Sequence, residues 1–321
     1  MIERNIPYIK RMPFRAILIL AVLFCGAMIL GAYFHDLRIV NCWVNYGSKI
    51  IATPVGTVEY YTYGSGKPVL ISHGAGGGFD QGLLISREFF GKGYRFILPS
   101  RFGYLRSKTN HKVTARLQAE AYAYILKDLG ISKVSVASFS AGGPAALSFA
   151  ANYPGQCENL IMMSSISAPI VNSKDDPVKT LAFRLLYQSN FLYWTVTKVF
   201  RSQLLSLYGL TAKDQQKLSG PDNRLIDDLF ATTMPVSLRA QGNFYDIHRV
   251  LPSVGEVESI KAPTLIIHVR QDPLIIFRNA EYTHRHVSGS ILVPLEYGGH
   301  FLMGHQREVA ARVRAFMSHT L

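Results

Sequence analysis

The sequence contains few cysteines and few charged residues for its length. Among 321 residues there are 3 cysteines, Cys25, Cys42 and Cys157, which are too few for a disulfide framework and lack the spacing of a zinc site. Charged residues make up 17% of the chain, and we find no internal repeat or low-complexity tract. No metal ion or organic cofactor is implied. The composition therefore predicts one large domain with a sizeable core.

The net charge is nevertheless +13. The basic residues do not cluster with aromatic residues or form a recognition-helix pattern, so we expect no nucleic-acid partner. A basic surface spread over the domain is the expected explanation. Attraction to anionic lipid headgroups is an alternative.

One long hydrophobic run lies near the N-terminus. Residues 16–34 carry no charge, and a helix of this length, at about 1.5 Å per residue, would span the hydrocarbon core of a bilayer. Four basic residues precede it, at Arg4, Lys10, Arg11 and Arg15. This bias predicts a cytoplasmic N-terminus and a domain on the extracytoplasmic side.

The run divides the chain into segments. We expect a cytoplasmic basic tail (1–15), a transmembrane signal anchor (16–34), a linker (35–55) and a globular domain (56–321). The alternative is a secreted protein whose signal peptide is cleaved near Ala27 or Ala32. Cleavage after Ala27 would leave the apolar residues 28–30 at the mature terminus, which favours the anchor.

A short segment in the middle of the chain has the pattern of a nucleophile elbow. Ser138-Phe139-Ser140-Ala141-Gly142 follows an apolar run and precedes a helix-forming stretch. Such a strand–turn–helix corner exposes the central serine, Ser140, while small neighbours keep the strand and helix apart. The following helix offers N-terminal amides, that of Ala141 first, to a developing negative charge.

A glycine-rich loop follows another predicted strand, residues 68–72. It runs from His73 to Gly78 and lacks the Gly-Lys-Ser/Thr ending of a phosphate loop. Backbone amides of such a loop can approach a substrate oxygen because no side chain blocks them. We expect Ala75, with Gly76 as second choice, to bind an oxyanion together with Ala141.

An acid and a histidine follow two later predicted strands. Asp272 comes directly after the strand 263–269, where it could orient a histidine, or alternatively cap a helix, since Pro273 follows. His300 lies on a glycine loop after the strand 290–295 and is the candidate general base, with His305 as the fallback.

These motifs resemble the α/β-hydrolase superfamily over roughly residues 55–318. The resemblance implies that Ser140, Asp272 and His300 form a catalytic triad, in the chain order nucleophile, acid, histidine. Ser138 departs from the usual glycine but is small enough for close packing. A serine nucleophile argues against the dehalogenase and epoxide hydrolase branches, which need a carboxylate.

Strands alternate with helices along the rest of the domain. This rhythm predicts an α/β fold with a mostly parallel central sheet and helices on both faces. It breaks at about 172–255, where the superfamily often carries a helical cap, and the apolar residues there suggest a pocket for an apolar acyl or alkyl group. We also mark Phe139 and Arg101 as candidate substrate contacts, although Arg101 fits a structural ion pair better.

The leading function is a membrane-anchored serine hydrolase that cleaves a carboxylic ester or related acyl bond through an acyl-enzyme on Ser140. Its partners would be a small acyl substrate with an apolar part and, through the N-terminal helix, a membrane. One alternative keeps the triad for thioester, amide, aminopeptide or carbon–carbon bonds. Acidic residues of the cap could then bind a free amino terminus; they are Asp175, Asp176, Asp214, Asp222, Asp227 and Asp228. Another alternative is a catalytically silent binding module.

Overall fold

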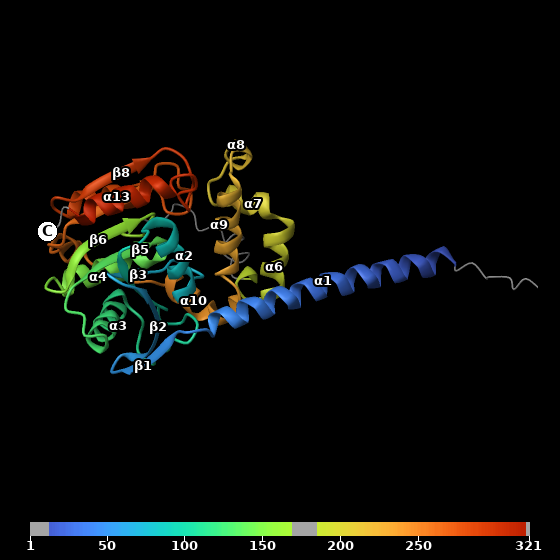
Figure 1. Ribbon diagram of the computed structural model, residues 1–321, viewed down its shortest axis with the longest axis horizontal. Coiled ribbons are helices and arrows are strands. Elements are labelled where there is room, and N and C mark those ends of the chain that lie inside the picture. Colours follow the sequence, from blue (N-terminus) through green and yellow to red (C-terminus); the bar gives the residue numbers. More distant parts are fainter. Residues whose placement is uncertain (1–12, 169–184, 319–321) are drawn as a thin grey trace, which may run out of the picture. The chain divides into compact units, whose positions relative to one another are not determined.

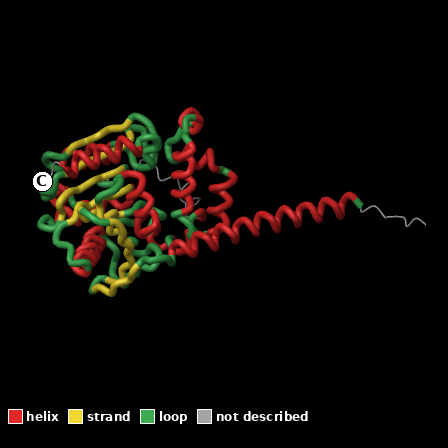
Figure 2. Tube along the Cα trace, viewed as in Figure 1, coloured by secondary structure: helices red, strands yellow, loops and turns green. Residues whose placement is uncertain are grey.

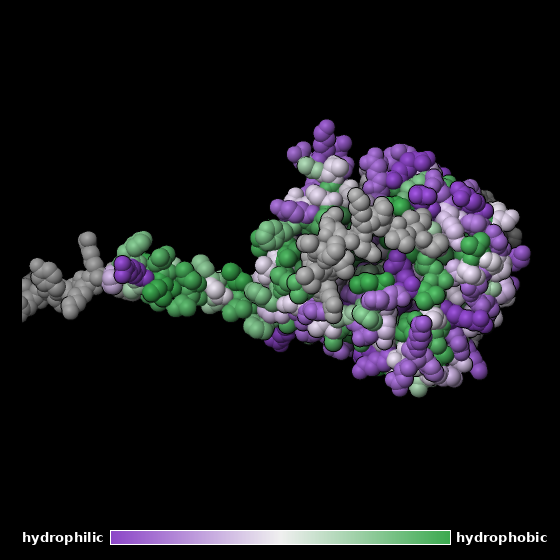
Figure 3. All heavy atoms as spheres, turned by 180° about the vertical axis from the view of Figure 1, so that it is seen from behind, coloured by the Kyte–Doolittle hydropathy of each residue, from purple (hydrophilic) through white to green (hydrophobic). Residues whose placement is uncertain are grey.

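A computed structural model describes residues 13–168 and 185–318 of the protein (Figure 1). The chain divides into two compact units, residues 1–39 and 40–321. The first unit holds most of helix α1 (Phe14–Val44), whose side chains are mainly hydrophobic (Figure 3). Among the described residues, α1 is the one helix long and apolar enough to cross a membrane by length and composition.

The second unit is built on an eight-stranded sheet of order β1-β2-β4-β3-β5-β6-β7-β8. Strands β3 to β8 are parallel, and β2 joins β4 antiparallel. The strands are β1 (Lys49–Thr53), β2 (Gly56–Gly64), β3 (Lys67–Ser72), β4 (Tyr94–Pro99), β5 (Val134–Phe139), β6 (Cys157–Met163), β7 (Thr264–Val269) and β8 (Ile291–Leu295). The mostly parallel sheet predicted from the sequence is confirmed.

The segment predicted as a linker, residues 35–55, contains regular secondary structure. Helix α1 continues to Val44, and β1 pairs antiparallel with β2 in a hairpin. The hairpin forms because Gly56, at φ +134°, lets the chain reverse while Thr53 Oγ1 donates to Gly56 O at 2.7 Å. The β-branched residues before this turn were the available signal. It is weak because β1 is an edge strand whose side chains are mostly exposed.

Helices cover both faces of the sheet (Figures 1 and 2). On one face, α2 (Phe79–Phe89) and α13 (Gln306–Ser318) share a hydrophobic core with Val69 and Ile71 of β3. On the other face, a second core includes Leu70 of the same strand. Its helices are α3 (Ala115–Asp128), α4 (Gly143–Asn152), α11 (Val254–Glu258) and α12 (Arg278–His286). Successive residues of a strand face opposite sides, which explains its continuous apolar run.

The described part of the insertion between β6 and β7 consists of helices joined by loops, with no strand, as expected for a cap. It comprises α6 (Asn190–Val199), α7 (Arg201–Leu207), α8 (Ala212–Gln216), α9 (Gly220–Ala231), the 3₁₀ turn η2 (Val236–Leu238) and α10 (Ala240–Ile247). Several of these helices begin with a side-chain cap; Ser219, for example, accepts from Asp222 N. Residues 169–184 of the predicted cap lie outside the described residues.

The strand order reverses next to β3, whose neighbours are β4 on one side and β5 on the other. Loops that leave the carboxyl ends of two strands at such a point diverge and leave a crevice between them. Here those loops are the glycine-rich segment after β3 and the elbow after β5. The fold therefore places the two predicted motifs beside each other.

Candidate active site

Ser140 occupies the sharp corner predicted from the sequence. It follows the last residue of β5 and adopts φ +52°, a conformation that non-glycine residues rarely occupy. A 3₁₀ turn, Ser140–Gly142, leads into α4. The corner needs glycine: a Cβ at Gly142 would lie 2.1 Å from Ser72 O, and one at Gly143 would lie 2.0 Å from Ile166 O.

Ser138 stands where a glycine is usual in such elbows, and the structure accommodates its hydroxyl. Its Oγ lies 2.8 Å from Ser165 Oγ and donates to Met162 Sδ at 3.1 Å. Ser165 Oγ in turn donates to Ser138 O at 3.1 Å. The extra hydroxyl is therefore buried with partners on the end of the neighbouring strand.

The glycine-rich loop lies directly against the serine. Ser72 of β3 pairs in register with Ser138 of β5, so the residues two positions further on meet. A Cβ on Gly74 would lie 3.1 Å from Ser140 Cβ, which is tight for any larger residue. The N–H of Gly76, the second candidate oxyanion donor, already donates to Asn243 Oδ1 of the cap at 2.7 Å. Ala75 thus remains the better candidate.

Asp272 is almost fully buried and uses its two oxygens for different partners. Oδ1 accepts from Leu274 N and Ile275 N at 2.9 and 3.0 Å, while Oδ2 lies 2.7 Å from His300 Nδ1. The histidine partner foreseen for this residue is therefore present. The helix cap is not, because the two backbone bonds lie in a turn and the next helix, α12, begins at Arg278 with Phe277 as its N-cap. Burial alone would raise the pKa of this carboxyl. His300 and His268 outweigh it through their charge and hydrogen bonds, so the pKa of Asp272 lies below its usual range.

His300 is held in place by the cap as well as by Asp272. Its backbone N–H donates to Tyr208 O at 2.8 Å, and the centre of its ring lies 5.2 Å from that of the Phe139 ring. Gly299 before it adopts φ +58°, and a Cβ there would lie 2.4 Å from Tyr208 O. The fallback histidine, His305, instead binds Glu308 at 3.0 Å at the start of α13.

A cavity of about 730 Å³ opens over these groups. It is lined by Ser140, His300, Ala75, Ala141 and Phe139. Asp272 does not line the cavity but contacts His300, which does. Apolar side chains form much of the remaining wall, among them Tyr208, Leu229, Phe230, Ile247 and Phe301. Within residues 13–168 and 185–318, no group of three or more His, Cys, Asp or Glu side chains is placed to hold a metal ion.

Arg101 does not take the substrate-binding position suggested for it. It is 7% exposed, pairs through both terminal nitrogens with Asp246 of α10 at 2.5 and 2.7 Å, and lines a separate cavity of about 40 Å³. The structural ion pair considered as its alternative is therefore the one observed. Burial disfavours its charge, but Asp246 outweighs this and raises the pKa of Arg101.

Of the described acidic residues proposed to bind an amino terminus, Asp214, Asp222 and Asp227 have other partners, and Asp228 is exposed on α9. Asp214 and Asp222 accept backbone hydrogen bonds as the third residues of capping boxes. Asp227 pairs with Arg201 at 3.2 Å. Asp175 and Asp176 lie outside the described residues.

Sequence reasoning missed three cap residues that contact the glycine-rich loop directly or through Arg101. They are Arg239, Asn243 and Asp246, at or within α10. No motif marks them, because their partners lie more than 140 positions earlier in the chain. The available signal was the spacing of Asn243 and Asp246, which places two polar side chains on one face of a helix.

Comparisons with known proteins identify the fold family. The alpha/beta hydrolase fold family matches residues 67–304. An uncharacterized hydrolase, YcgS, of Bacillus subtilis is 26% identical over 77% of this chain and 89% of its own. Lipase 1 of Psychrobacter immobilis is 27% identical over 56% of this chain and 60% of its own. A 2-hydroxy-6-oxo-6-phenylhexa-2,4-dienoate hydrolase of Burkholderia cepacia is 30% identical over 66% and 73% of the two chains.

Solved structures extend the likeness. An alpha/beta hydrolase fold protein from Nakamurella multipartita has a TM-score of 0.66 at 25% identity and covers 84% of this chain and 98% of its own. A membrane phospholipase A has the same fold, with a TM-score of 0.65 at 18% identity over 96% of this chain and 99% of its own. The chain therefore belongs to the α/β-hydrolase fold family and is a hydrolase.

Proposed function

We propose that the protein is a membrane-anchored serine hydrolase that cleaves a carboxylic ester or a related acyl bond through an acyl-enzyme on Ser140. The observation that carries this proposal is the 2.7 Å contact of His300 Nδ1 with Asp272 Oδ2 beside a cavity that both Ser140 and His300 line. A buried acid, a histidine and a serine at a strand-to-helix corner are the three parts that acyl transfer requires.

The reaction would begin with attack of Ser140 Oγ on the substrate carbonyl. His300 takes the proton, and Asp272 holds the imidazole in the required tautomer and stabilises its cation. The amides of Ala75 and Ala141 donate to the oxyanion of the tetrahedral intermediate. His300 then protonates the leaving group, and water releases the acyl group from Ser140 with His300 again as base.

The apolar cavity wall favours a substrate with an apolar acyl or alkyl part. The relative named a lipase supports an ester bond. Helix α1 supports a membrane anchor because it contains an apolar window with a mean hydropathy of 2.6 and only 6% of that window is buried. The basic residues before it favour a cytoplasmic N-terminus.

The decisive test is labelling by a fluorophosphonate probe, which reacts with activated serines. Membranes containing the wild-type protein should label, and membranes containing Ser140→Ala should not. Labelled protein would then be assayed with acyl esters of increasing chain length. Equal ester turnover by both proteins would refute Ser140 as the nucleophile. No labelling of either folded protein would favour the binding-module alternative.

A second candidate reaction is hydrolysis of a carbon–carbon bond, because one relative is named a dienoate hydrolase and is 30% identical over 226 residues. The same serine, histidine and cavity would serve it. A vinylogous 1,5-diketone offered beside an ester distinguishes the two. Turnover of the diketone with no ester cleavage would replace the ester proposal.

A further inference from the structure

The cap contacts the glycine-rich loop at three places through buried polar groups. Asp246 binds Arg101, and Arg101 Nη2 donates to Gly74 O at 3.1 Å. Asn243 Oδ1 accepts from Gly76 N at 2.7 Å, and Arg239 Nη1 donates to Gly77 O at 2.6 Å. The loop therefore does not hold its shape through its own residues alone.

The contact at Gly74 bears directly on Ala75. The oxygen of Gly74 and the N–H of Ala75 belong to the same planar peptide unit, and in a trans peptide they point in opposite directions. Whatever holds the Gly74 oxygen therefore sets the direction of the Ala75 N–H. Three donors converge on that oxygen: Arg101 Nη2, His73 Nδ1 at 2.7 Å and Gly77 N at 3.3 Å.

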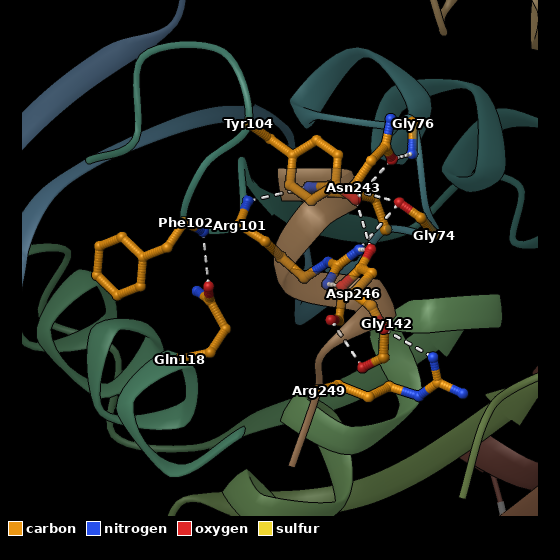
Figure 4. Close-up of polar contacts among 12 residues, drawn as sticks. Gly74, Gly76, Arg101, Phe102, Tyr104, Gln118, Gly142, Asn243, Asp246 and Arg249 are labelled. Carbon is orange, nitrogen blue, oxygen red and sulfur yellow. Dashed lines mark hydrogen bonds and ion pairs between the residues drawn. The ribbon is translucent and has the colours of Figure 1, made fainter. Parts of the chain in front are cut away.

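Asn243 fixes the next peptide. Because the Gly76 N–H is a donor, the atom of Asn243 that faces it must be the amide oxygen, which settles the orientation of the side chain. The Tyr104 hydroxyl lies between Asn243 Oδ1, at 3.0 Å, and Asp246 Oδ2. Figure 4 shows these side chains meeting from α10 and from the loop after β4.

Helix α10 packs closely against the loop after β4 because a glycine lies at the point of contact. Gly242 N donates to Gly103 O at 2.8 Å, and a Cβ at Gly242 would lie 2.3 Å from the Tyr104 ring. Arg101, Asn243 and Asp246 are each at least nine-tenths buried. An ion pair excluded from water holds its geometry more firmly than an exposed one, because water cannot replace either partner.

We propose that cap helix α10 positions the oxyanion donor of the hydrolase: Asp246, through Arg101, and Asn243 hold the peptides on either side of Ala75 so that its N–H faces the reacting oxygen. Asp246 and Asn243 are thus positioning residues for the chemical step. This inference rests on the proposed function. It means that the oxyanion donor is correctly oriented only when the cap is in the position seen here.

The test uses the detergent-solubilised full-length protein and a p-nitrophenyl acyl ester. Asp246→Asn removes the charge that holds Arg101, and Asn243→Ala removes the acceptor for Gly76 N. Matched controls are Asp227→Asn and Asn190→Ala. Asp227 pairs with Arg201 elsewhere in the cap, and Asn190 Oδ1 accepts from Ser237 N at 3.1 Å.

We expect Asp246→Asn and Asn243→Ala each to lower kcat about 10- to 100-fold, since loss of one oxyanion donor costs about 10²- to 10³-fold and a misdirected donor costs less. KM should change less than about twofold, because the interaction is made in the transition state. Affinity for an alkyl boronic acid, whose serine adduct mimics the tetrahedral intermediate, should fall in parallel with kcat/KM. Both controls should remain within about twofold of wild type.

Other outcomes would overturn the inference. If Ser140→Ala is inert but both cap variants match their controls, the inference fails and the proposed function stands. A raised KM with unchanged kcat would show that these residues contact substrate instead. If Ser140→Ala turns over like wild type, the proposed function fails and the inference fails with it. Should Asp246→Asn not fold, Asn243→Ala breaks no ion pair and decides the comparison.

Discussion

The Asp272 carboxylate binds His300 with one oxygen and its own loop with the other. Oδ2 lies 2.7 Å from His300 Nδ1, while Oδ1 accepts from Leu274 N and Ile275 N. The backbone bonds fix the carboxylate, so it can orient the histidine without moving itself. Residues 28 positions apart in the chain thereby form one rigid unit at the cavity.

This relationship predicts the effect of Asp272→Asn. The amide preserves the shape but can present N–H to the histidine, which favours the wrong imidazole tautomer and removes the stabilising charge. We expect kcat to fall about 10³- to 10⁴-fold with a small change in KM. Steady-state ester kinetics measure this, with Asp227→Asn as the control. A loss of less than about tenfold would remove Asp272 from the triad.

The backbone at Ser140 predicts a difference in stability between two inactive variants. At φ +52° a side chain is strained, by about 1–2 kcal/mol for a left-handed residue, whereas glycine is not. Greater flexibility of glycine in the unfolded chain offsets about 0.5–1 kcal/mol of this gain. We expect Ser140→Gly to unfold at a higher denaturant concentration than Ser140→Ala. Equal or reversed midpoints would mean that the corner is not strained.

The elbow also predicts which glycines tolerate a methyl group. A Cβ at Gly143 would lie 2.0 Å from Ile166 O, whereas one at Gly155 would have no atom within 4 Å. Gly143→Ala should lower the free energy of unfolding by about 1–3 kcal/mol or more, because backbone must shift. Gly155→Ala is the matched control and should change it by less than about 1 kcal/mol. Chemical denaturation of both variants provides the comparison.

His73 predicts a loss of stability in mild acid. It is fully buried, its Nε2 accepts from Arg101 N, and its Nδ1 lies 2.7 Å from Gly74 O, which leaves no place for a second proton. Burial, followed by the charge of Arg101, holds the pKa of His73 well below its ordinary value. The unfolded chain therefore binds the extra proton first, so stability is full above about pH 6.5 and falls as the pH is lowered.

The difference in proton binding between the folded and unfolded chain limits how much stability His73 can cost in acid. Between pH 7 and 5 the contribution of His73 can fall by at most about 2 kcal/mol, the linkage limit for one histidine that stays neutral in the folded protein while the unfolded chain takes up the proton. A His73→Gln variant should be less stable at pH 7 but should lose less stability on acidification. Denaturation at several pH values tests this. Parallel curves for the two proteins would contradict the prediction.

The N-terminal helix predicts how the protein is held in the cell. The full-length protein should stay in the membrane after alkaline carbonate washing, and the pair of substitutions Leu20→Arg and Leu23→Arg should release it, since each arginine at a helix centre opposes insertion by about 2.5–3.5 kcal/mol. Leu207→Arg, on the exposed surface of the cap, is the control. A mature N-terminus at Met28 or Tyr33 on protein sequencing would favour the secreted alternative.

Local signals in the chain were sufficient for the central strands, the elbow and the order of serine, acid and histidine. Buried parallel strands appear as short apolar runs, and a strand-to-helix corner needs small residues at fixed places, so both are written in neighbouring residues. The edge strand β1 escaped notice because one exposed face and a short length leave little pattern.

The partners of Arg101 could not be found in this way. Its carboxylate, Asp246, lies 145 positions further on, and Asn243 lies 167 positions from Gly76. Such pairs form only when tertiary packing places the cap against the loop. They cannot be predicted from local sequence, because a long-range contact leaves no periodic pattern in either segment. The candidate serine, acid and histidine could thus be proposed from local sequence, whereas the contacts of the glycine-rich loop with the cap followed from tertiary packing.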